Sequence, residues 1–361
     1  MPQSPSDRGD KETFKYNTNI DNGQIIGEKN LKNCSNNRVE PEDQGLKMAR
    51  FISICFLMSL VSVVAGCEER ESVAGVTSNR RTGSYPESFS MSSIWDDGLS
   101  EMSYYDAVDT IYGKPRHYVR VMLLNREWLN PEQRVKAERP QNVSTTQSTF
   151  QRASSIPVLK LNIVEEIPTE NYNYRYMVTV FLHRTSLLPE KLSASSQEWC
   201  GTTFKQLQWR PEGLKIRGFS YFEGEADREW SLPAKPVIYP QESLFVLARA
   251  AVASDRSLDL QLLPVMRSHH LAEPIPRRVR LDVSRDAQSV RVPLGRFGAR
   301  TVTVTGHGGK ETARFLVEGV PPYRLLRHSA PGLELSLRYV ERRAYWDRSK
   351  PSGFYRQGAA P

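Results

Sequence analysis

Cysteine is scarce in this chain of 361 residues, and its four cysteines are unevenly placed. Cys34, Cys55 and Cys67 lie in the N-terminal part, so Cys200 is the only cysteine in the body of the protein. If the N-terminal part is cleaved off and Cys67 is modified, an intramolecular disulfide and a four-cysteine zinc site are both excluded. We interpret Cys200 as a small buried apolar side chain rather than as a nucleophile.

Familiar catalytic motifs are also missing. The chain has no Gly-x-Ser-x-Gly elbow, no His-Glu-x-x-His motif and no Gly-rich phosphate loop before a helix. The adjacent pair His269 and His270 follows an expected strand, where we expect solvent exposure rather than metal binding. No basic helix, zinc finger or aromatic-basic RNA motif accompanies the basic residues. The sequence therefore predicts no metal, no cofactor and no nucleic-acid partner.

The composition is that of a water-soluble globular body. Hydrophobic residues make up 39% of the chain and charged residues 25%, with a mean hydropathy of −0.52. These values exclude a multi-span membrane protein and a disordered polymer. The net charge of +8 is unchanged when residues 1–66 are left out. Such a basic excess favours an anionic membrane surface or acidic envelope polymers as surroundings.

The apolar run at residues 51–64 is about fourteen residues long, the length of a signal-peptide core and short for a bilayer span. It follows Met48-Ala49-Arg50 and ends in Val64-Ala65-Gly66-Cys67. This quartet resembles the lipobox of bacterial lipoproteins, in which the cysteine thiol receives the lipid. A core helix or a single-span anchor is the alternative interpretation of the run.

The resemblance to a lipobox implies a cellular location as well as lipidation. A start at Met48 makes residues 48–66 a lipoprotein signal peptide and residues 1–47 an upstream extension that is not native. The mature protein then begins at Cys67, the lipidation site, and is anchored to a membrane by its N-terminal lipid. Glu68 rather than aspartate follows the cysteine, as in lipoproteins sent to the outer membrane of diderm bacteria, so we expect the periplasmic face of the envelope.

Strand patterns dominate the remainder of the chain. We expect a flexible tether at 67–94, one β-rich domain at 95–346 and a disordered tail at 347–361. Segments of strand character recur between turn residues; they are 104–112, 118–128, 158–167, 172–183, 191–200, 202–209, 214–225, 258–266, 278–283, 289–294, 300–305, 312–318, 323–327 and 333–340.

A single helix stands out among these strands. Residues 241–252 follow Pro240 and place Leu244, Leu247 and Ala251 on one face at helical spacing. We therefore predict a mainly β (α+β) fold, in which a curved antiparallel sheet or partly closed barrel packs on this one helix.

The segment SSQEWCG at residues 195–201 holds the first candidate site residues. On a strand, Gln197 and Trp199 face one side of the sheet, while Glu198 and Cys200 face the other. Either face then carries a polar group inward, which is costly unless the group has a partner or serves a site. We therefore treat Glu198, Trp199 and Cys200 as candidate binding or catalytic residues.

The second candidate segment is SYFEGE at residues 220–225. Tyr221, Glu223 and Glu225 share a face if the strand stays regular through Gly224. Two carboxylates near a third would suit acid–base chemistry or cation binding. The alternative is an exposed strand end with Gly224 in a turn, where the carboxylates pair with nearby arginines at 217 and 228.

SSQEWCG followed by SYFEGE resembles the signature of an uncharacterised family of bacterial envelope proteins. NREWL, VLKLN and the Tyr-rich strand before Phe181 occur in similar order in that family. Some members carry the label septum formation inhibitor Maf, but the Ser-x-Ser-Pro-Arg-Arg motif of the Maf pyrophosphatases is absent here. The resemblance spans most of residues 95–265 and implies a shared fold without an established activity.

Two functions remain open from the sequence. The first is a lipid-anchored envelope protein that binds an apolar or amphipathic ligand, such as a lipid, or a partner envelope protein, without catalysis. The alternative is an envelope hydrolase that uses Glu198, Glu223 or Glu225 around a cleft. A large apolar cavity favours the first function, and carboxylates that converge on a small polar pocket favour the second.

Overall fold

The computed structural model describes residues 86–137 and 154–349. The expected extension, signal peptide, lipidation site Cys67 and most of the expected tether and tail lie outside these residues. None of the helices within the described ranges is long and apolar enough to cross a membrane.

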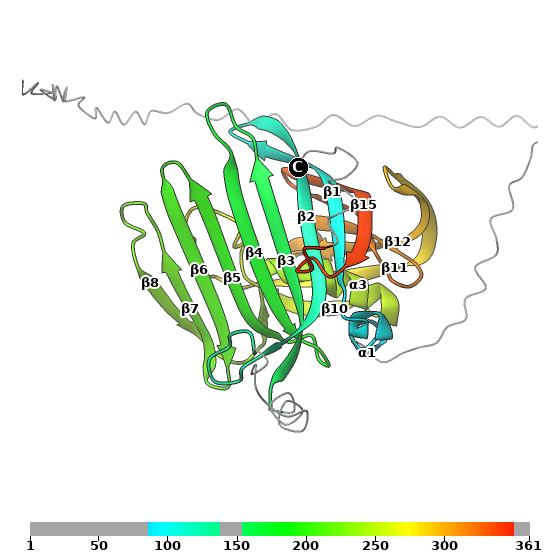
Figure 1. Ribbon diagram of the computed structural model, residues 1–361, viewed down its shortest axis with the longest axis horizontal. Helices are drawn as coiled ribbons and strands as arrows, with labels where there is room; N and C mark the ends of the chain where they lie inside the picture. The colour runs from blue at the N-terminus through cyan, green and yellow to red at the C-terminus, as the bar shows by residue number, and fades with distance from the viewer. Residues whose placement is uncertain (1–85, 138–153, 350–361) are drawn as a thin grey trace, which may run out of the picture. The chain divides into compact units, whose positions relative to one another are not determined.

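The described residues form one sheet of fifteen strands together with a few short helices (Figure 1). The strands are β1 (Ser100–Ile111), β2 (Lys114–Leu129), β3 (Ile156–Ile167), β4 (Tyr174–His183), β5 (Pro189–Glu198), β6 (Gly201–Arg210), β7 (Gly213–Phe219), β8 (Arg228–Leu232), β9 (Ile238–Tyr239), β10 (Leu258–Leu262), β11 (Arg277–Val292), β12 (Gly295–Thr305), β13 (Glu311–Glu318), β14 (Leu325–Ala330) and β15 (Leu333–Arg343). The helices are α1 (Glu87–Ser90), α3 (Leu244–Ser254) and the 3-10 turns η1 (Ser93–Asp96), η2 (Gln241–Ser243) and η3 (His307–Gly309).

Neighbouring strands pair in the order β8-β7-β6-β5-β4-β3-β2-β1-β15-β14-β13-β12-β11-β10-β9. All pairs are antiparallel except β9 with β10. The two edge strands β8 and β9 are joined by residues 233–237 alone, a segment that reaches roughly 20 Å at full extension. The sheet must therefore curve strongly to bring its edges near each other. The prediction of a mainly β fold with a curved antiparallel sheet is confirmed; the sheet is curved but not closed.

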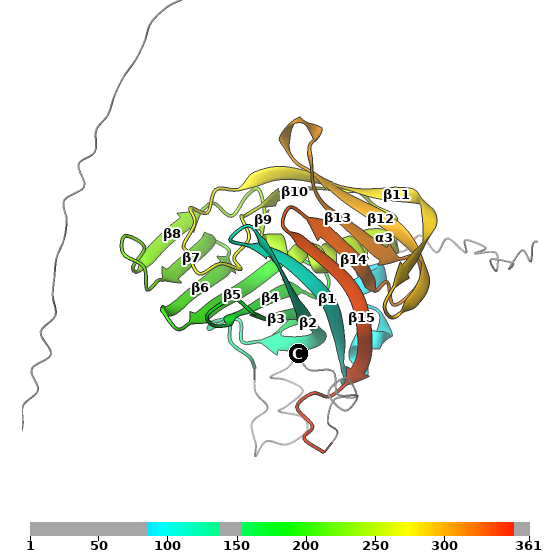
Figure 2. The ribbon, with the colours of Figure 1, turned by 90° about the horizontal axis from the view of Figure 1, so that it is seen from above.

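Helix α3 lies inside the curve of the sheet (Figure 2). The sequence predicted a helix at 241–252, and the structure has η2 followed by α3 through Ser254. Leu244, Leu247 and Ala251 are buried as expected, but Ala250 and Val252 on other faces are buried too. A helix enclosed by a sheet buries all its sides, so its pattern is apolar rather than amphipathic.

The folded body begins earlier than the sequence suggested. Phe89 in α1 is buried against Trp95, with the ring centroids 5.4 Å apart. Arg249 of α3 lies over both rings and forms an ion pair of 2.7 Å with Glu101 of β1. Residues 86–94 are therefore part of the folded body, and the prediction of a flexible tether through residue 94 is wrong at its C-terminal end.

Several strand predictions also differ from the structure. The expected strand 258–266 ends at Leu262, and β8 and β9 were not predicted. The segments 278–283 and 289–294 are parts of one strand, β11, whose register to β12 shifts between Val283 and Ala287. Such a shift lets a long strand bend without ending, and it explains the break in the pattern. The segment 214–225 ends as a strand at Phe219, which changes the candidate site.

Candidate functional site

The turns of four hairpins lie along one edge of the sheet, the upper edge in Figure 1, because consecutive strands from β1 to β8 run antiparallel. We call this the hairpin edge; it comprises residues 112–113, 168–173, 199–200 and 220–227. On the inner face of the sheet, the charged residues Asp109, Arg120 and Glu165 lie nearer this edge, together with some aliphatic residues. The residues farther away, such as Leu159, Val180 and Leu207, are aliphatic. The interior is therefore more polar towards the hairpin edge.

A cavity of about 140 Å³ lies where these two environments meet. Its walls come from β1 to β4, from η2 and α3, from β13 to β15 and from the segment after β10. The lining side chains are Asp109, Arg120, Ile163, Val178, Gln241, Glu242, Leu244, Phe245, Val265, Arg267, Ala313, Phe315, His328, Ala330, Pro331 and Leu333. This lining is apolar along most of its extent, with charged groups gathered in one part.

The charged part is built around Glu165, which is fully buried on β3. Its Oε1 accepts hydrogen bonds from Arg120 Nε at 2.7 Å and from the Tyr118 hydroxyl at 2.6 Å. Arg267 Nε lies 3.5 Å from the other oxygen, and Arg267 also forms an ion pair of 2.6 Å with Asp109. Burial opposes ionisation of Glu165, but the Arg120 and Arg267 guanidiniums lower its pKa. The two arginines are thus held in place by buried carboxylates.

Glu242 is a buried carboxyl group in the cavity wall. Its Oε1 accepts hydrogen bonds from the backbone N–H groups of Met266 and Arg267, at 2.5 and 3.1 Å. Its Oε2 is buried and has no hydrogen-bond partner among the described residues. Burial raises the pKa of Glu242. A buried polar atom without a partner is costly, so this oxygen lowers the stability of the fold beside the cavity.

His328 on β14 lines the opposite wall and is 5% exposed. Its Nδ1 lies 3.1 Å from the carbonyl oxygen of Arg314, and its ring lies against Phe315 and Phe245. Burial, together with the charge of Arg120, lowers the pKa of His328 to about 3. This part of the wall is therefore neutral at physiological pH.

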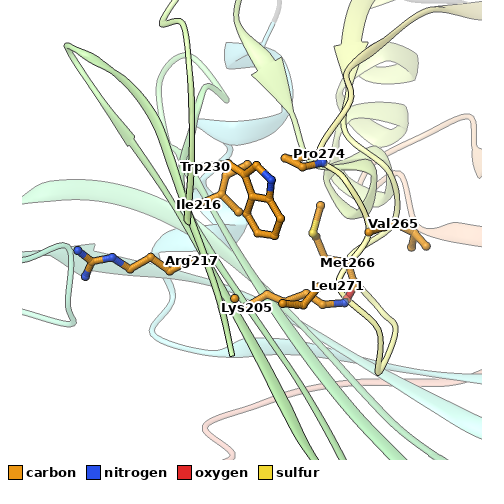
Figure 3. Close-up of a pocket in the computed structure, with 10 residues that line it drawn as sticks. Lys205, Ile216, Arg217, Trp230, Val265, Met266, Leu271 and Pro274 are labelled. Atoms are coloured by element: carbon orange, nitrogen blue, oxygen red, sulfur yellow. The ribbon is translucent and has the colours of Figure 1, made fainter. Parts of the chain in front are cut away.

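Residues 263–276, between β10 and β11, cross the inner face of the sheet, and we call this segment the strap. Lys205 of β6 donates hydrogen bonds to the carbonyls of Met266 and Ser268, at 3.0 and 2.8 Å, and burial lowers its pKa to about 8. Figure 3 shows Met266, Leu271 and other strap side chains packed against β6 to β8, where about 10 Å³ of space remains. The strap places Val265 and Arg267 on the cavity wall.

Glu198, a candidate from the sequence, is at the end of β5 with its side chain only 6% exposed. Its Oε1 lies 2.7 Å from Nδ1 of His269 in the strap, and the same Nδ1 lies 2.8 Å from the Tyr176 hydroxyl. Burial lowers the pKa of His269 against the opposing charge of Glu198. The prediction that His269 is exposed is wrong, because the strap folds it onto the Tyr-rich strand β4.

Trp199 and Cys200 do not continue β5, which ends at Glu198; they form its turn to β6. The Trp199 ring is 82% exposed and stacks on Tyr172, at 5.2 Å between centroids. Cys200 is exposed, and its Sγ lies 3.1 Å from the Tyr172 hydroxyl, a contact that raises the pKa of Tyr172 to about 12. The interpretation of Cys200 as a buried apolar side chain is therefore wrong.

Tyr221, Glu223 and Glu225 do not share a strand face, because β7 ends before them. Gly224 has a φ of +79°, so the chain turns there, as the alternative interpretation required. Glu225 pairs with His270 at 2.7 Å, not with either arginine, while Glu223 is exposed. The structure brings Glu198 and Glu225 to the same strap but gives each a different histidine.

The sequence interpretation missed Arg120, Glu242 and Arg267 in the cavity wall, and it missed Glu165, which pairs with both arginines. Arg120 and Glu165 occupy inward positions of the alternating strands β2 and β3, among apolar neighbours of the same parity. A charged residue at such a position was an available signal of a buried polar site. Arg267 had no comparable signal, because the strap has no regular structure.

Other polar groups of the described residues give less evidence of a binding site. No group of three or more histidine, cysteine, aspartate or glutamate side chains within residues 86–137 and 154–349 is placed to hold a metal ion. A hollow of about 290 Å³ lies on the outer face at the β6–β7 turn, lined by Gln206, Gln208, Arg210, Pro211, Glu212, Lys215 and Arg217. Its charges are largely compensated, since Arg217 pairs with Glu229 and Lys215 lies 3.8 Å from Glu212.

The fold is thus that of a mainly β protein with a curved open sheet around one helix. No family model matches the chain, and no curated protein matches it. Among solved structures it is similar to a β-barrel-like protein of a domain of unknown function, DUF1849, from Brucella abortus. That similarity has a TM-score of 0.41 at 9% sequence identity and covers 68% of this chain and 98% of that chain.

Proposed function

We propose that this protein is a lipid-anchored envelope protein that binds an amphipathic ligand in the cavity without chemical conversion. The observation that carries the proposal is the cavity's divided lining, in which the charged side chains of Asp109, Arg120 and Arg267 lie beside apolar walls. An apolar cavity of similar size, about 150 Å³, holds a molecule such as benzene. The space therefore suits part of an alkyl chain or a ring, with a polar group directed to the charged side chains.

The hydrolase alternative has weaker support. It requires carboxylates that converge on a pocket, one as acid and one as base or nucleophile. Glu198 and Glu225 contact different histidines, Glu223 is exposed, and none of the three lines the cavity. The geometry favours binding over catalysis.

The envelope location is supported by the sequence around Cys67. Expressed from Met48 in a diderm bacterium, the protein should incorporate labelled fatty acid and fractionate with the outer membrane. The Cys67→Ala variant should lose the label, since no other thiol lies in the lipobox-like quartet. Labelling that survives this substitution would contradict the anchor.

The binding proposal is tested with the neutral fluorophore N-phenyl-1-naphthylamine on the full chain. We expect one saturable site and displacement by 1-decanol, which joins a hydroxyl donor to an alkyl chain. Ala330 lines the cavity at the end of β14, so Ala330→Phe should fill part of the space and weaken probe binding at least tenfold.

The matched control is Ser329→Phe, because the neighbouring strand residue points to the other face of the sheet. This variant should bind the probe as the wild type does. Urea unfolding of both variants verifies that they are folded. Equal probe affinity of folded Ala330→Phe and wild type would place the probe elsewhere and refute the proposal.

A further inference from the structure

Each of the four turns of the hairpin edge carries an aromatic side chain. Tyr112 lies in the β1–β2 turn, Tyr172 in the β3–β4 turn, Trp199 in the β5–β6 turn, and Tyr221 with Phe222 in the β7–β8 turn. At the opposite edge, the turns at 184–188 and 211–212 carry none. Among the turns that join β4 to β8, the aromatic residues therefore lie on the hairpin edge alone; Figure 1 shows where this edge runs.

These rings are both exposed and connected. Tyr112 is 73% exposed, Trp199 82% and Tyr221 64%. Tyr174 links Tyr112 to Tyr172, with centroids 6.4 and 5.6 Å away, and Tyr172 stacks under Trp199. The exposed rings are therefore held in place from below by other rings, and they protrude from a rigid part of the fold.

The line of exposed rings is long. From the β1–β2 turn to the β7–β8 turn the chain crosses six strand spacings, which corresponds to about 29 Å. This length is far more than one sugar ring or one short peptide side chain requires. An extended surface matches it better than a small ligand does.

The charges at and beside these rings nearly balance in number. Lys114 and Arg116 both contact Glu170, at 2.8 and 2.6 Å. In the β7–β8 turn Glu225 pairs with His270, whereas Glu223 and Asp227 are exposed and Arg228 follows them. The three basic and four acidic side chains leave a formal charge of −1, which is too small to select an anionic or a cationic polymer.

Tyrosine and tryptophan have an apolar ring and a polar tip, and they are enriched where a bilayer meets water. We propose that the hairpin edge docks on the surface of a lipid bilayer, with Tyr112, Trp199 and Tyr221 inserted at the depth of the headgroups. A row of such side chains about 29 Å long, with balanced charge, fits the interface of zwitterionic lipids.

The position of the cavity supports the same occupant. Asp109 lies three residues before Tyr112, and Pro331 lies in the β14–β15 turn beside it, with Thr110 N–H donating to the Gly332 carbonyl at 2.8 Å. The cavity therefore reaches the edge that we propose docks, and a bilayer is a source of amphipathic molecules. This step rests on the proposed function, whereas the docking itself does not.

The test uses the full chain in phosphatidylcholine vesicles whose acyl chains carry bromine near the headgroup, since bromine quenches tryptophan that enters the bilayer. The chain has six tryptophans, and its first 94 residues have none, so the N-terminal apolar run contributes no signal. We expect Trp199→Phe to remove most of the bromine-dependent quenching. Trp346→Phe is the matched control, since Trp346 is 55% exposed but lies outside the four turns; it should leave the quenching as in wild type.

A second variant separates docking from the loss of a fluorophore. Tyr112→Ser/Tyr221→Ser keeps Trp199, and we expect it to reduce the quenching of Trp199 at least twofold because the edge docks less. Quenching that Trp199→Phe leaves unchanged would overturn the inference. Binding of N-phenyl-1-naphthylamine in solution should be the same for both edge variants and wild type. This measurement distinguishes a failure of the ligand-binding proposal from a failure of the bilayer-docking proposal.

Discussion

The buried histidine of the cavity wall should make the stability of this protein depend on pH. His328 has a pKa of about 3 in the folded protein, against 6.5 for an ordinary histidine, because it is buried and faces the charge of Arg120. Below pH 6.5 the unfolded chain therefore binds a proton that the folded protein does not. Stability contributed by this group falls as the pH falls, since protons favour the unfolded state.

The magnitude follows from the two pKa values. Between pH 7.5 and pH 5 the unfolded imidazole becomes almost fully protonated while the folded one stays neutral. The corresponding loss in the free energy of unfolding is about 2 kcal/mol. Such a loss is a substantial fraction of the stability of a typical domain.

Urea unfolding at the two pH values measures this loss. In His328→Asn the side-chain amide still donates to the Arg314 carbonyl but does not titrate, so the variant should lose about 2 kcal/mol less than wild type over this range. A constant cost of the substitution cancels in this difference. His307→Asn is the control, because that imidazole is exposed in the folded protein as in the unfolded chain.

Equal losses in wild type and His328→Asn would refute the reasoning. They would mean that water or an anion reaches the imidazole, so that burial does not keep His328 neutral. The apolar part of the proposed ligand site would then lose its physical basis.

Two further predictions concern buried charges. Glu101→Gln should lower the free energy of unfolding by about 3–5 kcal/mol, because it leaves the Arg249 guanidinium buried without its counter-charge. The double variant Glu101→Leu/Arg249→Met should recover much of the lost stability. Urea unfolding that shows no loss for Glu101→Gln would contradict the prediction. Glu198→Gln should lower the pKa of His269 further, because the carboxylate charge of Glu198 raises that pKa in the wild type. The free energy of unfolding should change by less than about 1 kcal/mol, because the amide oxygen still accepts a hydrogen bond from the imidazole. An NMR titration that shows no change in the His269 pKa would rule out the pairing.

The strand and helix patterns of the sequence were enough to predict the fold class. Alternation within segments such as 118–128 and 158–167 is a local property, and it marks a strand wherever the strand comes to lie. The helix after Pro240 was visible for the same reason. Local patterns failed where a strand stopped or bent, as at Phe219 and between Val283 and Ala287, because propensity alone places no end on a strand.

The candidate residues show the same division. Alternation along the strand left open whether Glu198 or Gln197 faces inward, and the structure buries the side chain of Glu198. Its partner His269 was not predicted, because the strap that carries it has no periodic pattern. Trp199 and Tyr221 were singled out as unusual, but their common edge depends on which turns the sheet topology brings side by side.

The amino-acid sequence by itself determined most of the strands, the long helix and their order along the chain. Tertiary structure alone decided the cavity, because Glu165 meets Arg120 and Arg267, which are 45 and 102 residues away along the chain. Contacts at such separations depend on strand register and on the curvature that brings β8 and β9 near each other. The register and the curvature are set by the packing of the whole sheet around α3, so they cannot be predicted from any short segment of the sequence.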